Sequence, residues 1–295
     1  MLVSDFDVVA SVTDGRQAIE TARQVNADAI VLDITMPGFD GFETMRALER
    51  AGSRAAVVFL SMLGDDEHVA EAFRLGGRGY VLKSYMLSDL PAALDQVLLG
   101  RRFVPSLTSC LEVVEGSGHA MHVHHDDGSL ADALSAFLAL ALHRGDAICV
   151  IGTEPLRQAV GVRLRARGWN VGGSMPHGRY RAYDAEEVLN DLMRNGLPVA
   201  SRLAEIVKEL EQYRRDFAAG PTSSLAVTGT LAGLLAARGN VEGAIGIEHL
   251  WTELTRGLPF ITVCGYSMSP FHDQVPDVWS RVTGEHSVIS HASDV

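Results

Sequence analysis

Short apolar runs that alternate with amphipathic stretches constrain the fold of this chain more than any other feature of its sequence. In the N-terminal third, these runs are AIVL at 29–32, AVVFL at 56–60 and GYVL at 79–82. A continuous apolar run of this length is typical of a strand covered on both faces, as in a parallel sheet. Because helix-like stretches separate the runs, the pattern predicts βαβ units and a doubly wound α/β fold. The other elements predicted here are a strand at 6–12 and helices at 14–25 (capped by Asp14 or Thr13), 42–51, 66–75 and 87–99.

A second α/β pattern follows a segment that contains glycine and proline. We place the first domain at 1–104, a linker at 105–118, the second domain at 119–280 and a polar, mobile tail at 281–295. The strands predicted in the second domain are 119–123, 146–152, 179–183, 224–229 and 260–266. The helices predicted there are 129–143, 154–167, 185–195, 199–217, 230–238 and 242–256.

Charge and composition disfavour several functions. The net charge of −12 disfavours broad binding to DNA or RNA, and there is no run of basic residues. No apolar stretch is long enough to cross a bilayer, and the N-terminus lacks the features of a signal peptide. The three cysteines, Cys110, Cys149 and Cys264, are far apart and odd in number, which favours reduced thiols. We therefore expect a cytoplasmic protein with no direct nucleic-acid or membrane partner.

Three polar residues stand where predicted strands end. Asp33 follows AIVL, Ser61 follows AVVFL and Lys83 follows GYVL. The carboxyl ends of strands in a doubly wound sheet line one crevice, so these side chains can converge there. The set suits phosphoryl transfer to a carboxylate: Asp33 would attack phosphorus, Ser61 would hydrogen-bond a phosphoryl oxygen and Lys83 would neutralise another. A Mg²⁺ ion would normally balance the remaining charge and needs carboxylate oxygens of its own.

The stretches VLDITMPGFDGFE, LSM and GYVLKSYMLSDL closely resemble the response-regulator receiver domain, specifically receivers of the LuxR/NarL type. The resemblance covers about residues 5–104 and implies a flavodoxin-like fold with Asp33 as phospho-acceptor, Ser61 as switch hydroxyl and Lys83 as the essential lysine. It also implies that Pro37 and Gly38 shape the acceptor loop and that Tyr80 is the switch aromatic. A sensor histidine kinase, Mg²⁺ and a phosphorylation-linked homodimer through strand 79–82 and helix 87–99 are the partners it implies.

The chain departs from the receiver pattern at its start. Receivers open with a strand that ends in two adjacent acidic residues, which hold Mg²⁺, whereas this sequence starts near the family's second strand. In the strand order 2-1-3-4-5 that first strand is central, so strand 6–12 would lack a neighbour, at roughly 1–3 kcal/mol per unpaired buried backbone group. Two interpretations remain open: the natural start lies further upstream, or this is a degenerate receiver that docks a partner without phosphate.

The second domain resembles the MEDS sensory domain, which looks related to the RecA/KaiC-type core. The resemblance rests on His119 and HHDD at 124–127, and on LALALHRGDAICVIGTEPLRQAVGVRLRARGWNV at 138–171. It continues through YDAEEVL (183–189), LAVTG (225–229), IEHLWTEL (247–254) and ITVCGY (261–266). The family pattern commonly has an acid where this chain has Thr230.

Nucleotide hydrolysis is not expected of this second α/β domain. A P-loop needs G-x-x-x-x-G-K-[ST] after the strand, but CVIG is followed by TEPLRQ. For Thr153 and Glu154 the favoured interpretation is the start of a helix, with Thr153 as the cap and Glu154 stabilised by the helix dipole. The candidate sensory pocket at the strand ends comprises Gly152, Thr153, Glu154, Asp184, Thr228, Gly229, Cys264 and Tyr266.

Four histidines near the start of the second domain raise the possibility of a metal site. His119, His122, His124 and His125 lie close in sequence, but no cysteine or glutamate pair nearby completes a tetrahedral set. A surface cluster of histidines that titrates near neutrality is therefore the favoured interpretation, and the sequence assigns no metal to these histidines.

We conclude from the sequence that the chain is a response regulator without its own DNA-binding domain, whose output is a protein–protein interaction with an unknown partner. The alternative is a module that senses a small molecule or cofactor and carries a vestigial, non-phosphorylated receiver. We expect no enzymatic activity beyond self-phosphorylation and autodephosphorylation at Asp33.

Overall fold

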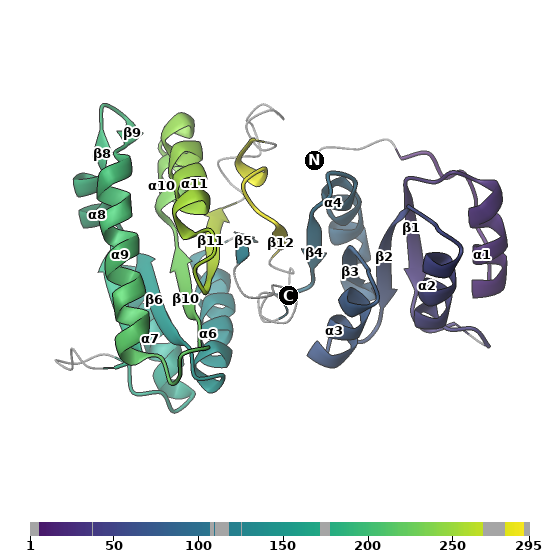
Figure 1. Ribbon diagram of the computed structural model, residues 1–295, viewed down its shortest axis with the longest axis horizontal. Coiled ribbons are helices and arrows are strands. Elements are labelled where there is room, and N and C mark those ends of the chain that lie inside the picture. Colours follow the sequence, from purple (N-terminus) through teal and green to yellow (C-terminus); the bar gives the residue numbers. More distant parts are fainter. Residues whose placement is uncertain are drawn as a thin grey trace. The chain divides into compact units, whose positions relative to one another are not determined.

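The computed structural model describes residues 6–36, 38–106, 109, 118–124, 126–171, 178–267 and 281–291. The chain folds as two compact units, and the division falls between Pro105 and Ser106. Each unit contains a parallel β-sheet with helices on its faces (Figure 1).

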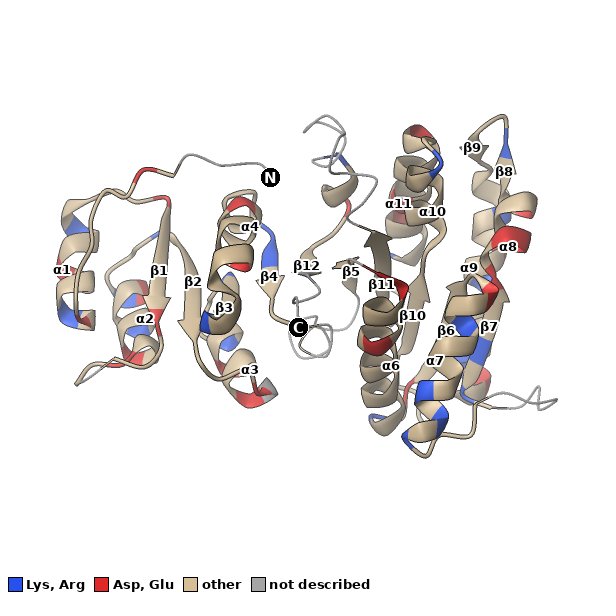
Figure 2. Ribbon diagram, turned by 180° about the vertical axis from the view of Figure 1, so that it is seen from behind, with Lys and Arg blue, Asp and Glu red and all other residues tan. Residues whose placement is uncertain are grey.

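The N-terminal unit is built on four parallel strands in the order β1-β2-β3-β4. The helices α2 and α3 cover one face of this sheet, and α4 covers the other (Figures 1 and 2). Apolar residues of β2 and β3, among them Val58, Phe59 and Val81, are fully buried between the two layers, as the continuous apolar runs predict. The strands are β1 (Ala29–Asp33), β2 (Ala56–Ser61), β3 (Gly79–Leu82) and β4 (Arg102–Val104), and the helices are α1 (Gly15–Gln24), α2 (Gly41–Arg50), α3 (Asp66–Arg74), the short 3₁₀ turn η1 (Lys83–Tyr85) and α4 (Met86–Leu98).

Aspartates start the first three helices of this unit. The carboxylates of Asp14, Asp40 and Asp65 accept hydrogen bonds from backbone amides in the first turns of α1, α2 and α3. Each cap satisfies donors that have no partner within the helix. The cap predicted at Asp14 is confirmed.

The strand predicted at 6–12 is wrong. These residues form no regular element and are exposed, with Val8 83% and Val9 61% accessible. Among the described residues, no strand pairs with β1 on the side away from β2. An apolar, β-branched segment cannot become a strand without a neighbour to accept its hydrogen bonds. Over its described residues, the unit is therefore a doubly wound sheet without the first strand of the flavodoxin-like order, as expected.

The C-terminal unit is built on six parallel strands in the order β12-β5-β11-β10-β6-β7. The helices α6 and α7 cover one face, and α8 to α11 cover the other (Figures 1 and 2). The strands are β5 (Gly118–His124), β6 (Ala147–Gly152), β7 (Tyr180–Asp184), β10 (Leu225–Gly229), β11 (Phe260–Ser267) and β12 (Val288–His291). The helices are α6 (Asp127–His143), α7 (Glu154–Ala166), α8 (Ala185–Leu192), α9 (Ala200–Phe217), α10 (Leu231–Ala237) and α11 (Val241–Thr255).

Two features of the C-terminal unit differ from the sequence-based expectations. The helix predicted at 185–195 ends at Leu192, because an antiparallel hairpin of β8 (Met193–Arg194) and β9 (Leu197–Pro198) follows it. The hairpin turns at Asn195 and Gly196, both with positive φ. The tail predicted from residue 281 is also wrong over 281–291, where β12 pairs with β5 and Val288 and Ile289 are buried.

Candidate functional sites

The carboxyl ends of β1 and β3 bring Asp33 and Lys83 into direct contact. Asp33 is the last residue of β1, and Lys83 directly follows β3. The Lys83 Nζ donates to Asp33 Oδ2 at 2.5 Å, while Asp33 Oδ1 accepts from the Thr35 amide at 2.9 Å. Both side chains keep about a third of their surface exposed, 33% for Asp33 and 30% for Lys83. The pair is therefore accessible to a reactant and contributes little to stability as a surface ion pair.

Ser61 and Tyr80 meet at the backbone of Leu63, in the loop after β2. The Ser61 Oγ, buried at the end of the strand, accepts from the Leu63 amide at 3.0 Å. The fully buried Tyr80 donates its hydroxyl to the Leu63 carbonyl at 2.6 Å. Burial raises the pKa of the Tyr80 phenol, and its hydrogen bond with Ser61 opposes that shift only in part. The serine and the tyrosine thus hold the same loop, next to the Asp33–Lys83 pair rather than on it.

The loop after Asp33 is shaped by glycines and a capping box. Gly38 has a φ of +83°, in the left-handed region that favours glycine, whereas Pro37 lies outside the described residues. Asp40 caps α2 and exchanges hydrogen bonds with Glu43. A Cβ on Gly41 would lie 2.5 Å from the Asp33 carbonyl oxygen. The first turn of α2 therefore packs directly on the backbone of Asp33.

The described residues do not complete a magnesium site at Asp33. Mg²⁺ takes oxygen ligands in an octahedral arrangement and is usually held by one or two carboxylates. Both carboxylate oxygens of Asp33 are already engaged, by Lys83 and by the Thr35 amide. Within the described ranges, Asp33 belongs to no group of three or more His, Cys, Asp or Glu side chains able to share an ion. Among the described residues, Asp33 alone could supply only part of a magnesium ligand set.

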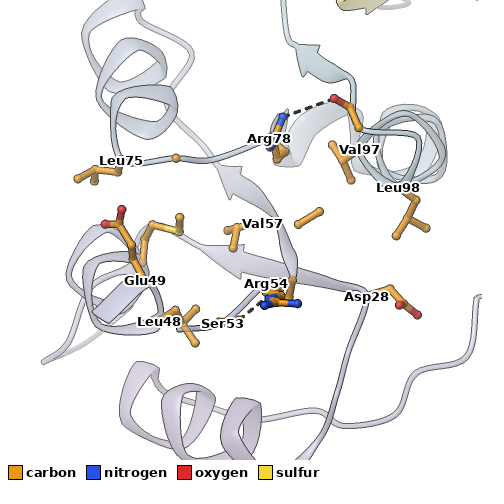
Figure 3. Close-up of a pocket in the computed structure, with 15 residues that line it drawn as sticks. Asp28, Leu48, Glu49, Ser53, Arg54, Val57, Leu75, Arg78, Val97 and Leu98 are labelled. Atoms are coloured by element: carbon orange, nitrogen blue, oxygen red, sulfur yellow. Dashed lines mark hydrogen bonds between the residues drawn. The ribbon is translucent and has the colours of Figure 1, made fainter. Parts of the chain in front are cut away.

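A surface hollow of the N-terminal unit lies away from the Asp33–Lys83 pair (Figure 3). Asp28, Ala56 and Arg78 line it at the amino ends of the strands, whereas Asp33 and Ser61 are at the carboxyl ends. The Arg78 guanidinium donates to the carbonyl of Gly100 across its rim at 3.4 Å. The hollow therefore plays no part in the predicted phosphoryl chemistry.

In the C-terminal unit, the predicted sensory pocket divides into separate groups. Asp184 accepts from Arg157 at 2.6 Å and caps α8, and the guanidinium holds the pKa of that carboxyl below its usual range. Glu154 accepts from Gln158 within α7, and Thr153 precedes that helix as its N-cap residue. Thr153, Glu154 and Asp184 therefore act in the structure as residues that begin helices or form local polar pairs. Thr228 is buried within β10.

Cys264 and Tyr266, two further residues of the predicted pocket, belong to a buried polar cluster. Their neighbours are His119 of β5, Glu248 of α11 and His286, which precedes β12. Glu248 Oε2 lies 3.0 Å from His119 Nε2, 3.5 Å from Cys264 Sγ and 3.6 Å from His286 Nε2. His119 Nε2 lies 3.2 Å from Cys264 Sγ, and Tyr266 donates its hydroxyl to Glu248 Oε1. Sequence analysis missed Glu248 and His286, although IEHLWTEL contains the first.

The expected surface cluster of histidines is wrong for the three that the structure describes. His119, His122 and His124 are all buried in β5, and His125 lies outside the described residues. His122 Nδ1 is 2.9 Å from Ser290 Oγ, so it contributes to the pairing of β5 with β12. Buried imidazoles in a strand between two neighbours cannot act as a solvent-exposed pH-titrating patch.

The N-terminal unit places an aspartate, a serine and a lysine at the carboxyl ends of successive parallel strands, as its resemblance to receiver domains implies. Comparison with known proteins shows that the chain belongs to two families. Residues 2–95 match the response regulator receiver domain, and residues 118–281 match MEDS, the methanogen/methylotroph DcmR sensory domain. The recognition of both families from sequence is thereby confirmed.

Three curated relatives are similar to the N-terminal part. The Fimbriae Z protein of Salmonella typhimurium is 32% identical over 42% of this chain and 58% of its own length. The nitrate/nitrite response regulator NarL of Escherichia coli is 35% identical over 34% of this chain and 46% of its own length. The chemotaxis protein CheY of Listeria monocytogenes is 31% identical over 32% of this chain and 78% of its own length. The chain thus spans about half the length of the first two relatives.

The chain therefore contains a response regulator receiver domain, the part that it shares with these relatives. Of the helices in the described ranges, none has both the length and the apolar character that crossing a bilayer requires.

Proposed function

We propose that this response regulator accepts a phosphoryl group on Asp33 and passes the signal to its MEDS domain, which acts on a partner protein. The observation that supports this is the 2.5 Å contact between the Lys83 ammonium and the Asp33 carboxylate, in a partly exposed position. A lysine so placed can offset the charge that a phosphoryl group adds. A sensor histidine kinase is the donor that the receiver family implies.

The proposed reaction is a displacement at phosphorus. A carboxylate oxygen of Asp33 forms the new O–P bond, and the bond from phosphorus to the donor atom breaks, with the electron pair leaving on the donor. Lys83 then faces a phosphoryl oxygen in place of the carboxylate oxygen it holds in this structure. The product is an acyl phosphate on Asp33.

Ser61 and Tyr80 would transmit the change. To donate its hydrogen to a phosphoryl oxygen, the Ser61 hydroxyl would turn toward Asp33, which would shift the Leu63 amide from which the Ser61 oxygen now accepts. Tyr80 holds the carbonyl of the same residue. Phosphorylation would therefore rearrange the loop after β2, and α4, where Leu87 is 91% exposed, is the surface we propose for homodimerisation.

The proposal is tested by intact-mass analysis after incubation with acetyl phosphate, with and without Mg²⁺. We expect one added phosphoryl group on the wild-type chain and none on Asp33→Asn, which keeps the side-chain shape and an acceptor for Lys83. Asp28→Asn is the matched control, because Asp28 is an exposed carboxylate just before the other end of β1. Equal labelling of wild type and Asp33→Asn, or no labelling of a folded wild-type chain, would refute the proposal.

The second candidate function is a sensory module in which the receiver is vestigial. The buried His119–Glu248–Cys264 cluster favours it, because polar side chains are costly to bury unless they are paired or bind something. A folded wild-type chain that accepts no phosphoryl group would leave this candidate standing.

A further inference from the structure

We infer that His119, Glu248, Cys264 and His286 bind a single transition-metal ion of the zinc class within the MEDS domain. This inference rests on the geometry of the C-terminal unit and does not depend on phosphorylation of Asp33. The four side chains come from β5, α11, β11 and the segment before β12.

The donor atoms converge on one point. One donor atom from each of the four residues lies within 4.8 Å of all the others. The four separations given above run from 3.0 to 3.6 Å. Zinc bonds of about 2.0–2.3 Å to nitrogen, oxygen and sulfur place tetrahedral ligands roughly 3.3–3.8 Å apart. The cluster therefore needs shifts of only a few tenths of an ångström along these edges to coordinate an ion.

The other side of each histidine is held as a metal-binding histidine requires. His119 Nδ1 lies 3.0 Å from Thr252 Oγ1, and His286 Nδ1 lies 3.0 Å from the Val282 carbonyl oxygen. The Val282 carbonyl can only accept, so Nδ1 of His286 carries the proton and its Nε2 lone pair is directed at the cluster. An outer partner of this kind fixes the ring and its tautomer in metal sites.

The carboxylate of Glu248 is arranged in the same way. Tyr266 donates to Oε1, while the two imidazoles and the thiol all approach the second oxygen, Oε2. The carboxylate is only 1% exposed. Glu248 Oε2 therefore faces the Nε2 atoms of His119 and His286 and the Sγ of Cys264, so the four possible metal-ligand atoms surround one position.

The ligand set selects the kind of ion. Two imidazoles, one thiolate and one carboxylate suit Zn²⁺ and related ions, whereas Mg²⁺ and Ca²⁺ prefer oxygen ligands alone. Four protein ligands complete a tetrahedron, so the ion would be structural or sensed rather than catalytic. It would tie the segment that carries His286 to β5 and β11.

The test measures metal content and a cobalt spectrum on the full-length chain. Purified protein is stripped with chelator, reloaded with Zn²⁺ or Co²⁺, dialysed and measured for metal per chain, with circular dichroism as the folding check. We expect one ion per chain and, with Co²⁺, a thiolate-to-cobalt charge-transfer absorption that Cys264→Ser abolishes. His286→Ala should reduce retained metal at least tenfold.

Two further variants separate the site from general damage. His249→Ala should retain a full equivalent, because His249 is an exposed neighbour of Glu248 that contacts Glu285 instead. Thr252→Val should weaken binding about 10–100-fold through the orientation of His119 alone. If folded wild-type protein gives no thiolate-to-cobalt band, the inference is overturned even where the ligand variants fail to fold, and an unchanged band in Cys264→Ser overturns it as well.

Discussion

Replacing Gly41 by alanine should destabilise the receiver and slow its phosphorylation. The added Cβ would lie 2.5 Å from the carbonyl oxygen of Asp33 and 2.8 Å from the Cα of Ile34. Both are backbone atoms, so the clash cannot be relieved by rotating a side chain, and either β1 or the first turn of α2 must move. Overpacking of this kind costs about 1–3 kcal/mol, and the better helix propensity of alanine offsets at most about 1 kcal/mol.

We therefore expect the free energy of unfolding of the receiver to fall by about 1–2 kcal/mol. Because Asp33 itself is displaced, its rate of phosphorylation at a temperature where the variant is folded should fall more than stability alone explains. Urea unfolding and a time course of intact mass measure the two effects. Gly38→Ala is the matched control, because its Cβ meets nothing within 4 Å and only backbone strain at φ +83° is tested. A Gly41→Ala chain as stable and as reactive as wild type would refute the packing argument.

Three other perturbations have defined outcomes. Asp40→Ala removes the cap of α2 and should lower the free energy of unfolding of the receiver by about 1 kcal/mol in urea titrations, and no change would mean that the cap is not formed in solution. Tyr80→Phe removes the hydroxyl that donates to the Leu63 carbonyl and should lower the free energy of unfolding by about 0.5–1.5 kcal/mol in the same assay, whereas a stabilised variant would contradict the hydrogen bond. The hydrogen bond from Arg214 lowers the pKa of Glu211, so the stability that this carboxylate adds is complete at neutral pH and is lost as the pH falls below the usual glutamate pKa of about 4.3. In urea unfolding at several pH values, Glu211→Gln should therefore lose less free energy of unfolding at acid pH than the wild type. An identical dependence on pH in the two proteins would refute the role of the pair.

Local patterns predicted most elements of the fold because they carry their own signal. The apolar runs that end at Asp33 and Ser61 form strands as expected, and helix caps such as Asp14 lie within one turn of the residues they bind. The hairpin at Asn195–Gly196 had an equally local signal, since Asn-Gly is a favoured two-residue turn, but the helical pattern before it was extended too far.

The failures concern residues whose conformation depends on distant partners. Residues 6–12 have strand-like composition but no adjacent strand among those described, and composition alone cannot report that. The His119 cluster could not be assembled from sequence because Cys264 is 145 positions away and is brought close only by the pairing of β5 with β11. Because the sequence analysis compared His119 only with the histidines next to it in sequence, it did not find the metal-binding partners Glu248, Cys264 and His286 that the fold brings to it.

The position of β5 between β11 and β12 has a consequence for synthesis on the ribosome. Met121 is in register with Cys264 on one side and with Ile289 on the other, so the first strand of the C-terminal unit to emerge pairs with the last two. Such long-range contacts form late, and both edges of β5 stay unpaired until β11 and β12 have been synthesised. The receiver can meanwhile complete its own fold from earlier residues. A nascent chain that stops before residue 281 would expose an edge of β5 to pairing with other chains, which makes β12 a determinant of aggregation as well as of structure.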